Sequence, residues 1–167
     1  LRMKHGVVKR ELDGQRQVVW NLRYPDPSID IALCYPYGIP EIKNLVSKSK
    51  GYWKLDGIGI SRRGREIIRL SNLYQSMSDH HPGIYIVTRR HAGETPGSWV
   101  LDGLLRRFSM LGKTQFLVWA LPLSDIDGVL HGDYPTSSSN TCDLSLQCLH
   151  LDIQRWKERC RPLLLLN

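Results

Sequence analysis

The sequence predicts an α/β fold in which strands and helices alternate along the chain. Residues 84–88 and 115–121 are apolar runs with the composition of strands buried in the centre of a sheet. A segment with helical signals begins at Thr95 between them, and another follows at about residues 149–159. Such alternation is typical of layered α/β domains. A chain of 167 residues, 41% hydrophobic and 23% charged, is large enough for one packed domain.

The N-terminal residues 1–28 are expected to be the C-terminal part of a small β domain. Two β-rich runs, residues 6–9 and 17–22, flank the pair Asp13-Gly14. This pair is typical of the turn of a β-hairpin. Residues 29–34 predict a further strand, with which the second domain begins.

The central part of the chain predicts one helix and two strands. Residues 39–48 carry apolar side chains three and four positions apart, which is the spacing of an amphipathic helix. Residues 53–61 and 66–70 predict two strands joined by a turn at Gly64. A polar loop is expected at residues 72–83.

The second half begins with a well-marked helix. Thr95 is expected as its N-cap and Pro96 as its first residue, while Gly112 is expected to end it. Residues 124–140 are rich in Asp, Gly and Ser and predict a long loop. Residues 162–166 predict the final strand.

The two ends of the chain suggest that it is a fragment. It begins with Leu1 rather than methionine, and it ends at Asn167 directly after apolar residues that predict a strand. The backbone groups of a core strand need hydrogen-bond partners. We therefore expect a piece of a longer protein, cut at both ends.

The charge pattern bears on possible partners. The net charge is +7, but the arginines are spread out in pairs such as Arg62-Arg63 and Arg89-Arg90. Without a long basic run or an aromatic–basic repeat, we expect no nucleic-acid partner. No apolar run approaches the ~20 residues of a membrane span, so we expect no membrane partner. Two interpretations of the basic surface stay open: a solvated face, or a groove that attracts acidic chains.

The cysteines bear on the compartment. Cys34, Cys142, Cys148 and Cys160 are irregularly spaced and form no Cys-x-x-Cys motif. There is no secretory signal at the start of the sequence. Reduced thiols in a cytoplasmic protein are therefore expected.

The stretch between the predicted strand 84–88 and the helix at Thr95 holds the clearest candidate for chemistry. His91 and Glu94 lie three residues apart in it. An imidazole nitrogen and a carboxylate oxygen are half of a tetrahedral zinc site, and a catalytic zinc needs three protein ligands. The plain alternative is a surface turn with a glutamate at a helix N-terminus, which is favourable for the helix dipole.

Three stretches together resemble the zinc carboxypeptidase family, in particular its cytosolic-carboxypeptidase-like branch. The first is Tyr35-Pro-Tyr-Gly38 with Ile58-Gly-Ile-Ser-Arg-Arg-Gly64, which resembles the entry to the catalytic domain. The second, His91-Ala-Gly-Glu-Thr-Pro-Gly-Ser-Trp99, resembles the zinc motif His-Pro-Gly-Glu-Thr-Pro-Ser-Ser-Trp. The third, Ser124-Asp-Ile-Asp-Gly-Val-Leu-His-Gly-Asp-Tyr134, resembles the loop Asn-Pro-Asp-Gly-Val.

The resemblance implies a three-layer α/β/α fold with a mixed central sheet. The sheet is expected to be incomplete here, with residues 29–167 as the N-terminal part of the catalytic domain.

The resemblance also implies roles for particular residues. His91 and Glu94 become ligands of one zinc ion, and Asp127 accepts a hydrogen bond from His91 as its supporting partner. His131 is expected to be a loop histidine rather than a ligand. The third ligand is expected about two residues past the chain end, with His150 as the other candidate. The general-base glutamate is expected later still, so no catalytic residue lies in this chain.

Two positions depart from the family pattern. Leu146 stands where the family has an arginine that binds the substrate carboxylate, and Pro135 stands where a second arginine is expected. Leucine cannot bind a carboxylate. Three explanations stay open: another arginine such as Arg155 or Arg159 takes over, the local sequence is shifted, or the protein is a degenerate member.

The function implied is that of a zinc-dependent metallocarboxypeptidase, a hydrolase that removes C-terminal residues from peptides or proteins. The expected partner is thus a peptide or protein C-terminus, and the fragment alone is expected to be inactive. The alternative is a catalytically degenerate relative that binds zinc or peptide. A basic nucleic-acid-binding domain is a third and weaker reading.

Overall fold

The computed structural model describes residues 7–10, 16–19, 32, 34–72, 81–112, 115–132 and 144–167. The chain divides into two compact units, Leu1–Leu33 and Cys34–Asn167. In the first unit, strands β1 (Val7–Arg10) and β2 (Arg16–Val19) pair antiparallel. The predicted pairing of these two β-rich runs is confirmed. That residues 1–28 end a larger β domain stays a prediction.

The second unit contains a five-stranded sheet in the order β3-β4-β6-β5-β7. Strand β4 pairs antiparallel with both β3 and β6, whereas β5 pairs parallel with β6 and β7. The predicted mixed sheet is thereby confirmed. The elements are α1 (Ile39–Lys48), β3 (Trp53–Ile60), β4 (Glu66–Asn72), β5 (Pro82–Val87), α2 (Thr95–Leu111), β6 (Leu117–Leu121), α3 (Ile126–His131), α4 (Leu144–Lys157) and β7 (Arg161–Leu166).

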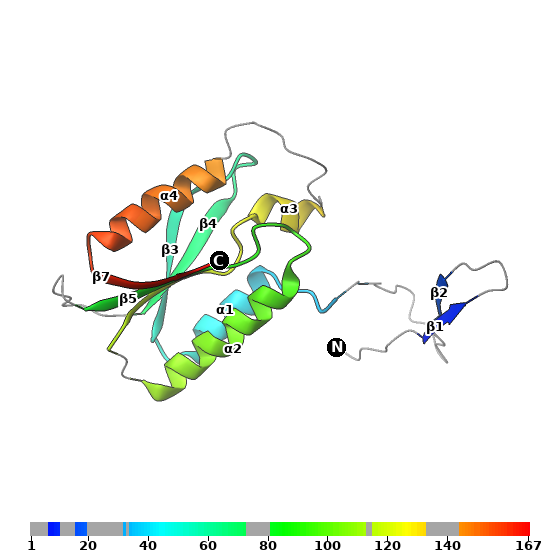
Figure 1. Ribbon diagram of the computed structural model, residues 1–167, viewed down its shortest axis with the longest axis horizontal. Coiled ribbons are helices and arrows are strands. Elements are labelled where there is room, and N and C mark those ends of the chain that lie inside the picture. The colour runs from blue at the N-terminus through cyan, green and yellow to red at the C-terminus, as the bar shows by residue number, and fades with distance from the viewer. Residues whose placement is uncertain are drawn as a thin grey trace. The chain divides into compact units, whose positions relative to one another are not determined.

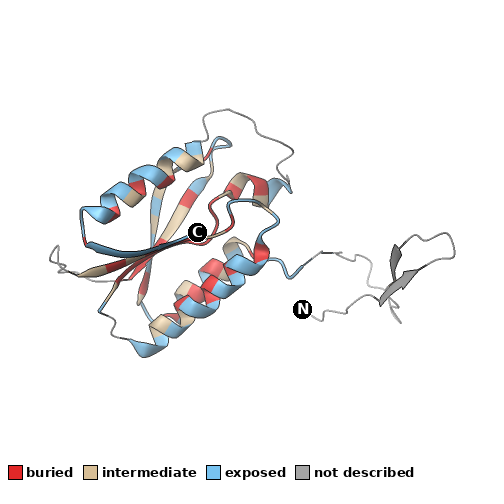
Figure 2. Cartoon of the chain, viewed as in Figure 1, coloured by how far each residue is buried: buried red, intermediate tan, exposed pale blue. Residues whose placement is uncertain are grey.

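Helices cover both faces of this sheet, which gives the predicted three layers. Helices α1 and α2 lie on one side and α4 on the other (Figure 1). Successive side chains of a strand point to opposite faces. In β6, Val118 accordingly joins the core under α1 and α2, and Trp119 joins the core under α4. Figure 2 shows buried residues concentrated along the strands and on the helix faces turned toward them.

Several boundaries differ from the prediction. Helix α4 begins at Leu144, five residues earlier than expected, and the short helix α3 occupies the start of the predicted loop 124–140. Glu94 rather than Thr95 takes the N-cap position of α2. Of the predicted strand 29–34, residues 32 and 34 are described and are not in a strand. No helix in the described part of the chain combines the length and apolar character needed to cross a bilayer.

Candidate functional site

The motif that begins at His91 and resembles a zinc-binding motif lies at the carboxyl ends of the parallel strands β5 and β6. Beyond the end of β5, the Thr88 N–H donates to the Leu121 carbonyl oxygen at 2.9 Å. The Ser124 N–H donates to the Thr88 carbonyl oxygen at 3.2 Å, and the Asp125 N–H to that of Arg89 at 3.0 Å. The segments that follow β5 and β6 therefore stay hydrogen-bonded to each other after the strands end. This edge of an open α/β sheet is where ligands commonly bind.

A buried arginine holds the turn between β5 and α2. Arg89 adopts a left-handed backbone conformation with a φ of 60°. Its Nε donates to the Ala92 carbonyl oxygen at 2.7 Å, and its guanidinium also donates to the Tyr37 carbonyl oxygen at 2.9 Å. Burial lowers the pKa of Arg89, and the acidic groups of Cys34, Asp125 and Glu94 oppose that effect. The side chain stays charged, because arginine does not lose its proton in proteins.

Sequence reasoning missed this role of Arg89. The pair Arg89-Arg90 was interpreted as part of a dispersed basic surface, but only Arg90 is exposed. A usable signal was the position of Arg89 directly after a strand of buried residues. A charged side chain there is either buried with hydrogen-bond partners or exposed to solvent at the sheet edge.

His91 and Glu94 converge in the same turn. The His91 Nδ1 lies 2.6 Å from the Glu94 Oε1, and the His91 backbone N–H donates to the Glu94 Oε2 at 3.1 Å. Both side chains are half exposed, so the pair is open to solvent. The hydrogen bond with His91 holds the pKa of Glu94 below its ordinary value. Glu94 is thus a carboxylate at neutral pH.

The pair has the chemistry of two zinc ligands but not yet their spacing. Each ligand atom lies about 2.0–2.2 Å from a tetrahedral zinc, which puts two such atoms about 3.3–3.6 Å apart. The 2.6 Å between Nδ1 and Oε1 is instead a hydrogen-bond distance. Metal binding would replace the shared proton and open the pair slightly. Because both side chains are half exposed, they can move apart by this amount without displacing packed neighbours.

The other histidines of the described part of the chain do not complete a site with this pair. His81 directly precedes β5, His131 ends α3 and His150 lies on α4. The side chains of His131 and His150 are exposed. Within the described residues, no group of three or more His, Cys, Asp or Glu side chains could hold a metal ion. The described residues therefore offer this pair no third metal ligand.

Asp127 is held by the turn between β3 and β4. Its Oδ1 accepts from the Ser61 hydroxyl at 2.9 Å and from the Arg65 guanidinium at 2.7 Å, and its Oδ2 accepts from the Arg63 backbone N–H at 3.0 Å. Partial burial would raise the pKa of this carboxyl, but these hydrogen bonds hold it below its ordinary value. No hydrogen bond of a described residue joins Asp127 to His91, which differs from the arrangement that the resemblance implies.

An apolar hollow lies beside the motif. Its volume is about 430 Å³, and its lining comes from the Tyr35 turn and the first residues of α2, namely Cys34, Tyr35, Thr95, Pro96 and Trp99. The Trp99 Nε1 donates to the Tyr35 carbonyl oxygen at 3.1 Å. The rings of Tyr37 and Trp99 also meet edge to face, with centroids 5.0 Å apart. The hollow therefore begins one residue after Glu94.

Leu146, one of the two departures from the family pattern, has a structural role. It lies in the first turn of α4 and packs, partly buried, against the core between α4 and the sheet. Pro135 lies outside the described residues. Of the four cysteines, Cys34, Cys148 and Cys160 are free thiols, and Cys142 lies outside the described residues.

Comparison with known proteins agrees with this picture. The chain is 29% identical to cytosolic carboxypeptidase 2 of Xenopus tropicalis over 150 residues, covering 78% of this chain and 16% of the relative. It is 26% identical to cytosolic carboxypeptidase 2 of Danio rerio over 147 residues, covering 76% and 20%. The chain is similar in sequence to cytosolic carboxypeptidases. Its resemblance to the zinc carboxypeptidase family is thereby confirmed, although no family model matches it.

Solved structures support the same fold. A metallo-carboxypeptidase from Burkholderia cenocepacia superposes with a TM-score of 0.59 at 16% identity, covering 72% of this chain and 38% of that one. A metallo-carboxypeptidase from Pseudomonas aeruginosa gives 0.56 at 20% identity, covering 77% and 39%. At these identities the likeness speaks for the fold. The chain spans only 16% and 20% of the length of the two curated relatives.

Proposed function

We propose that this chain supplies part of the metal site of a zinc-dependent carboxypeptidase, which removes C-terminal residues from peptides or proteins. The observation that carries the proposal is the convergence of the His91 Nδ1 and the Glu94 Oε1 at the open end of the parallel strands. The relatives named cytosolic carboxypeptidase support the reaction class. They also support a place in the cytoplasm, where thiols such as the three free ones of this chain stay reduced.

In this proposal His91 and Glu94 hold one zinc ion together with a histidine from outside the described residues. The ion supplies Lewis-acid polarisation of the scissile carbonyl and lowers the pKa of a bound water to about 7. Glu94 binds as a carboxylate without first releasing a proton, because its pKa is already low. His91 has to be neutral at Nδ1 to bind, so it gives up the hydrogen bond to Glu94.

In this proposal Arg89 and Trp99 hold His91 and Glu94 in position. Arg89 fixes the turn that precedes His91 by donating to the Ala92 carbonyl oxygen. Trp99 anchors the first turns of α2 to the Tyr35 carbonyl oxygen, and Glu94 directly precedes that helix. Neither side chain touches the reacting atoms, so we assign both a positioning role.

The test is peptidase activity of the full-length protein on short peptides, with and without a chelator. We expect chelation to abolish release of the C-terminal residue and added zinc to restore it. Glu94→Gln should reduce activity by more than about 100-fold, because even partners of metal ligands cost about 10–100-fold. The matched control is Glu158→Gln, an exposed glutamate just after α4. Activity that survives the chelator and the Glu94→Gln change would overturn the zinc mechanism.

The isolated chain should show no turnover in the same assay, because the described residues supply two ligands where three are needed. Turnover by the isolated chain, at the level of the full-length protein, would show that the site is built from other residues than those named here.

A degenerate relative that binds without hydrolysis is the second candidate, and the packing of Leu146 favours it. A side chain that fills the core cannot also bind a substrate carboxylate. In this case the full-length protein binds zinc but hydrolyses peptides poorly. Efficient turnover by the unaltered protein would remove this candidate. The basic net charge of +7 is compatible with acidic peptides under either reading.

A further inference from the structure

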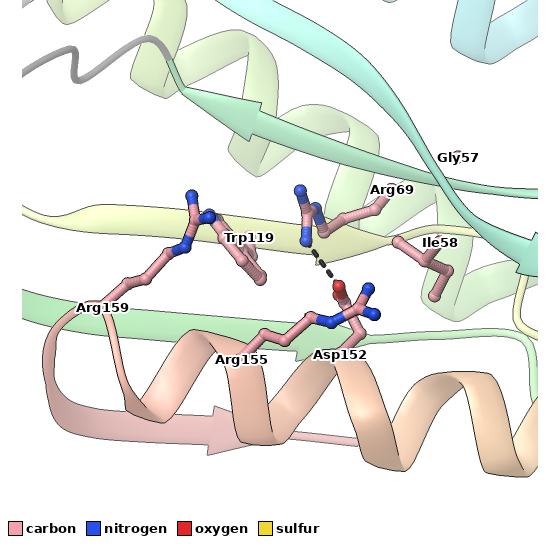
Figure 3. Close-up of a pocket in the computed structure, with 7 residues that line it drawn as sticks. All are labelled: Gly57, Ile58, Arg69, Trp119, Asp152, Arg155 and Arg159. Carbon is pink, nitrogen blue, oxygen red and sulfur yellow. Dashed lines mark hydrogen bonds and ion pairs between the residues drawn. The ribbon is translucent and has the colours of Figure 1, made fainter.

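A second pocket lies on the opposite side of the sheet, between α4 and strands β3, β4 and β6. Its volume is about 130 Å³. Three of the lining residues are arginines, which face one tryptophan and one aspartate (Figure 3). The full lining is Gly57, Ile58, Arg69, Trp119, Asp152, Arg155 and Arg159. The pocket shares none of these residues with the site at His91 and Glu94.

Arg69 forms a rigid floor for this pocket. Its guanidinium bonds Asp152 at 2.6 Å and Asp56 at 2.8 Å. Its central carbon lies 3.4 Å from the centroid of the Trp119 ring, a cation–π contact that fixes the plane of the group. The Tyr85 hydroxyl donates to the other oxygen of Asp152 at 2.7 Å. The guanidinium therefore cannot swing away.

One donor of this floor is left without a partner. The Nε of Arg69 is buried and makes no hydrogen bond within the described part of the chain. Buried polar atoms in native proteins almost always have a partner, so an orphaned charged donor calls for an acceptor that is not part of the protein.

Two further arginines leave the pocket positive. Arg155 lies on α4 and Arg159 lies two residues after its end (Figure 3), and neither guanidinium makes a hydrogen bond or ion pair with a described residue. Both line the same pocket, Arg155 from the last turn of α4 and Arg159 from the turn that follows it. The three arginines face two aspartates, Asp56 and Asp152, which both pair with Arg69, so the group keeps a net positive charge of one.

The strand at the far wall of the pocket is irregular at the same place. The antiparallel register of β3 and β4 shifts between Gly57 and Gly59, which leaves Ile58 without a partner across the ladder. Gly57 and Ile58 both line the pocket. Bulges of this kind often accompany binding sites, because they re-aim the chain locally.

We propose that this pocket binds a phosphate group. Arginine forks match the oxygens of phosphate in paired hydrogen bonds, and Arg155 and Arg159 each offer such a fork beside a group with a net positive charge. The volume of about 130 Å³ is below the ~300 Å³ at which pockets for whole small molecules begin, so the site takes a single small group. The group is either free inorganic phosphate or the phosphate of a monoester.

The experiment is calorimetric titration of this chain with inorganic phosphate and, separately, with phenyl phosphate, at constant ionic strength. We expect saturable binding of at least one of them. The variant Arg155→Gln/Arg159→Gln should bind at least tenfold more weakly. The matched control is Arg107→Gln/Lys157→Gln, which removes the same charge from exposed positions outside the pocket and should bind within twofold of the unaltered chain.

The remaining outcomes decide the source of the group and the validity of the proposal. Binding of inorganic phosphate alone assigns the free ion, whereas equal or tighter binding of phenyl phosphate assigns a monoester. Arg159→Lys keeps the charge but not the fork, so its affinity should fall between those of the unaltered chain and the double variant. No saturable binding of either compound, or equal weakening in the double variant and its control, would overturn the proposal.

Discussion

The indole N–H of Trp99 donates to the carbonyl oxygen of Tyr35 at 3.1 Å, across 64 positions of sequence. This bond joins two of the stretches that carry the family resemblance, the Tyr35 turn and the helix after Glu94. The Tyr37 ring adds an edge-to-face contact with Trp99. The start of α2, directly after Glu94, is therefore held in place by the turn at Tyr35 to Tyr37, which precedes β3 in the sequence.

The first prediction concerns this bond. Trp99→Phe keeps a ring against Tyr37 but removes the donor, and we expect the free energy of unfolding to fall by about 0.5–1.5 kcal/mol. Trp99→Ala also removes the ring contact and should cost about 0.5–1.5 kcal/mol more. Urea unfolding followed by circular dichroism measures both. If Trp99→Phe is as stable as the unaltered chain, the bond does not anchor the helix.

The fold was predictable where local signals agree with packing. The helix at residues 39–48 was expected at those bounds, because its apolar spacing coincides with an N-terminal box in which the Gly38 N–H donates to Glu41 at 2.8 Å. Gly112 ends α2 as expected, with a φ of 74° that favours glycine. The start of α4 was placed too late, because Leu144 and Leu146 lie in a stretch without a capping signal.

The candidate site was predictable only in part. His91 and Glu94 lie within one turn, so their convergence follows from spacing. The inward turn of Arg89 and the clamp on Asp127 depend on residues more than 50 positions away. Such tertiary contacts leave no periodic trace in the sequence. The same holds for Leu146, because its packing depends on core residues from several strands and from α4.

A second prediction concerns acid stability at Asp127. The folded-state pKa of this carboxyl is lowered, so its bonds contribute stability above the unfolded pKa of about 3.9, and that stability is lost as the pH falls through the folded value. Asp127→Asn should cost about 1 kcal/mol at pH 7. The difference from the unaltered chain should shrink between pH 5 and pH 3.

Denaturant unfolding at several pH values measures this difference. Glu158→Gln serves as the control, since its side chain makes no hydrogen bond with a described residue, and it should change stability little at any pH. A constant gap between Asp127→Asn and the unaltered chain down to pH 3 would show that the charge of Asp127 contributes nothing.

A third prediction concerns the buried pair of Arg69 and Asp152. Asp152→Ala leaves the Arg69 guanidinium without its partner under α4, and breaking a buried pair in this way typically costs about 3–5 kcal/mol. Tyr85→Phe removes one hydrogen bond to the carboxylate and should cost about 1.5–3 kcal/mol. The double variant should cost less than the sum of the two, because both changes remove the same interaction. Additive losses would mean that Tyr85 and Asp152 stabilise the core independently.

A fourth prediction concerns β7, one of the two edge strands of the described sheet. Strand β7 pairs with β5 on one side only, and its four leucines, Leu163 to Leu166, are 42–56% exposed. An exposed apolar edge strand is a template for pairing with another chain. We expect this chain to self-associate, and Leu163→Lys/Leu165→Lys to shift it toward monomer in sedimentation velocity. The control Val100→Lys/Leu104→Lys changes exposed apolar residues of α2 and should leave the association unchanged. Equal effects of both variants would indicate general hydrophobic contact, and unchanged association of the β7 variant would exclude this edge as the contact.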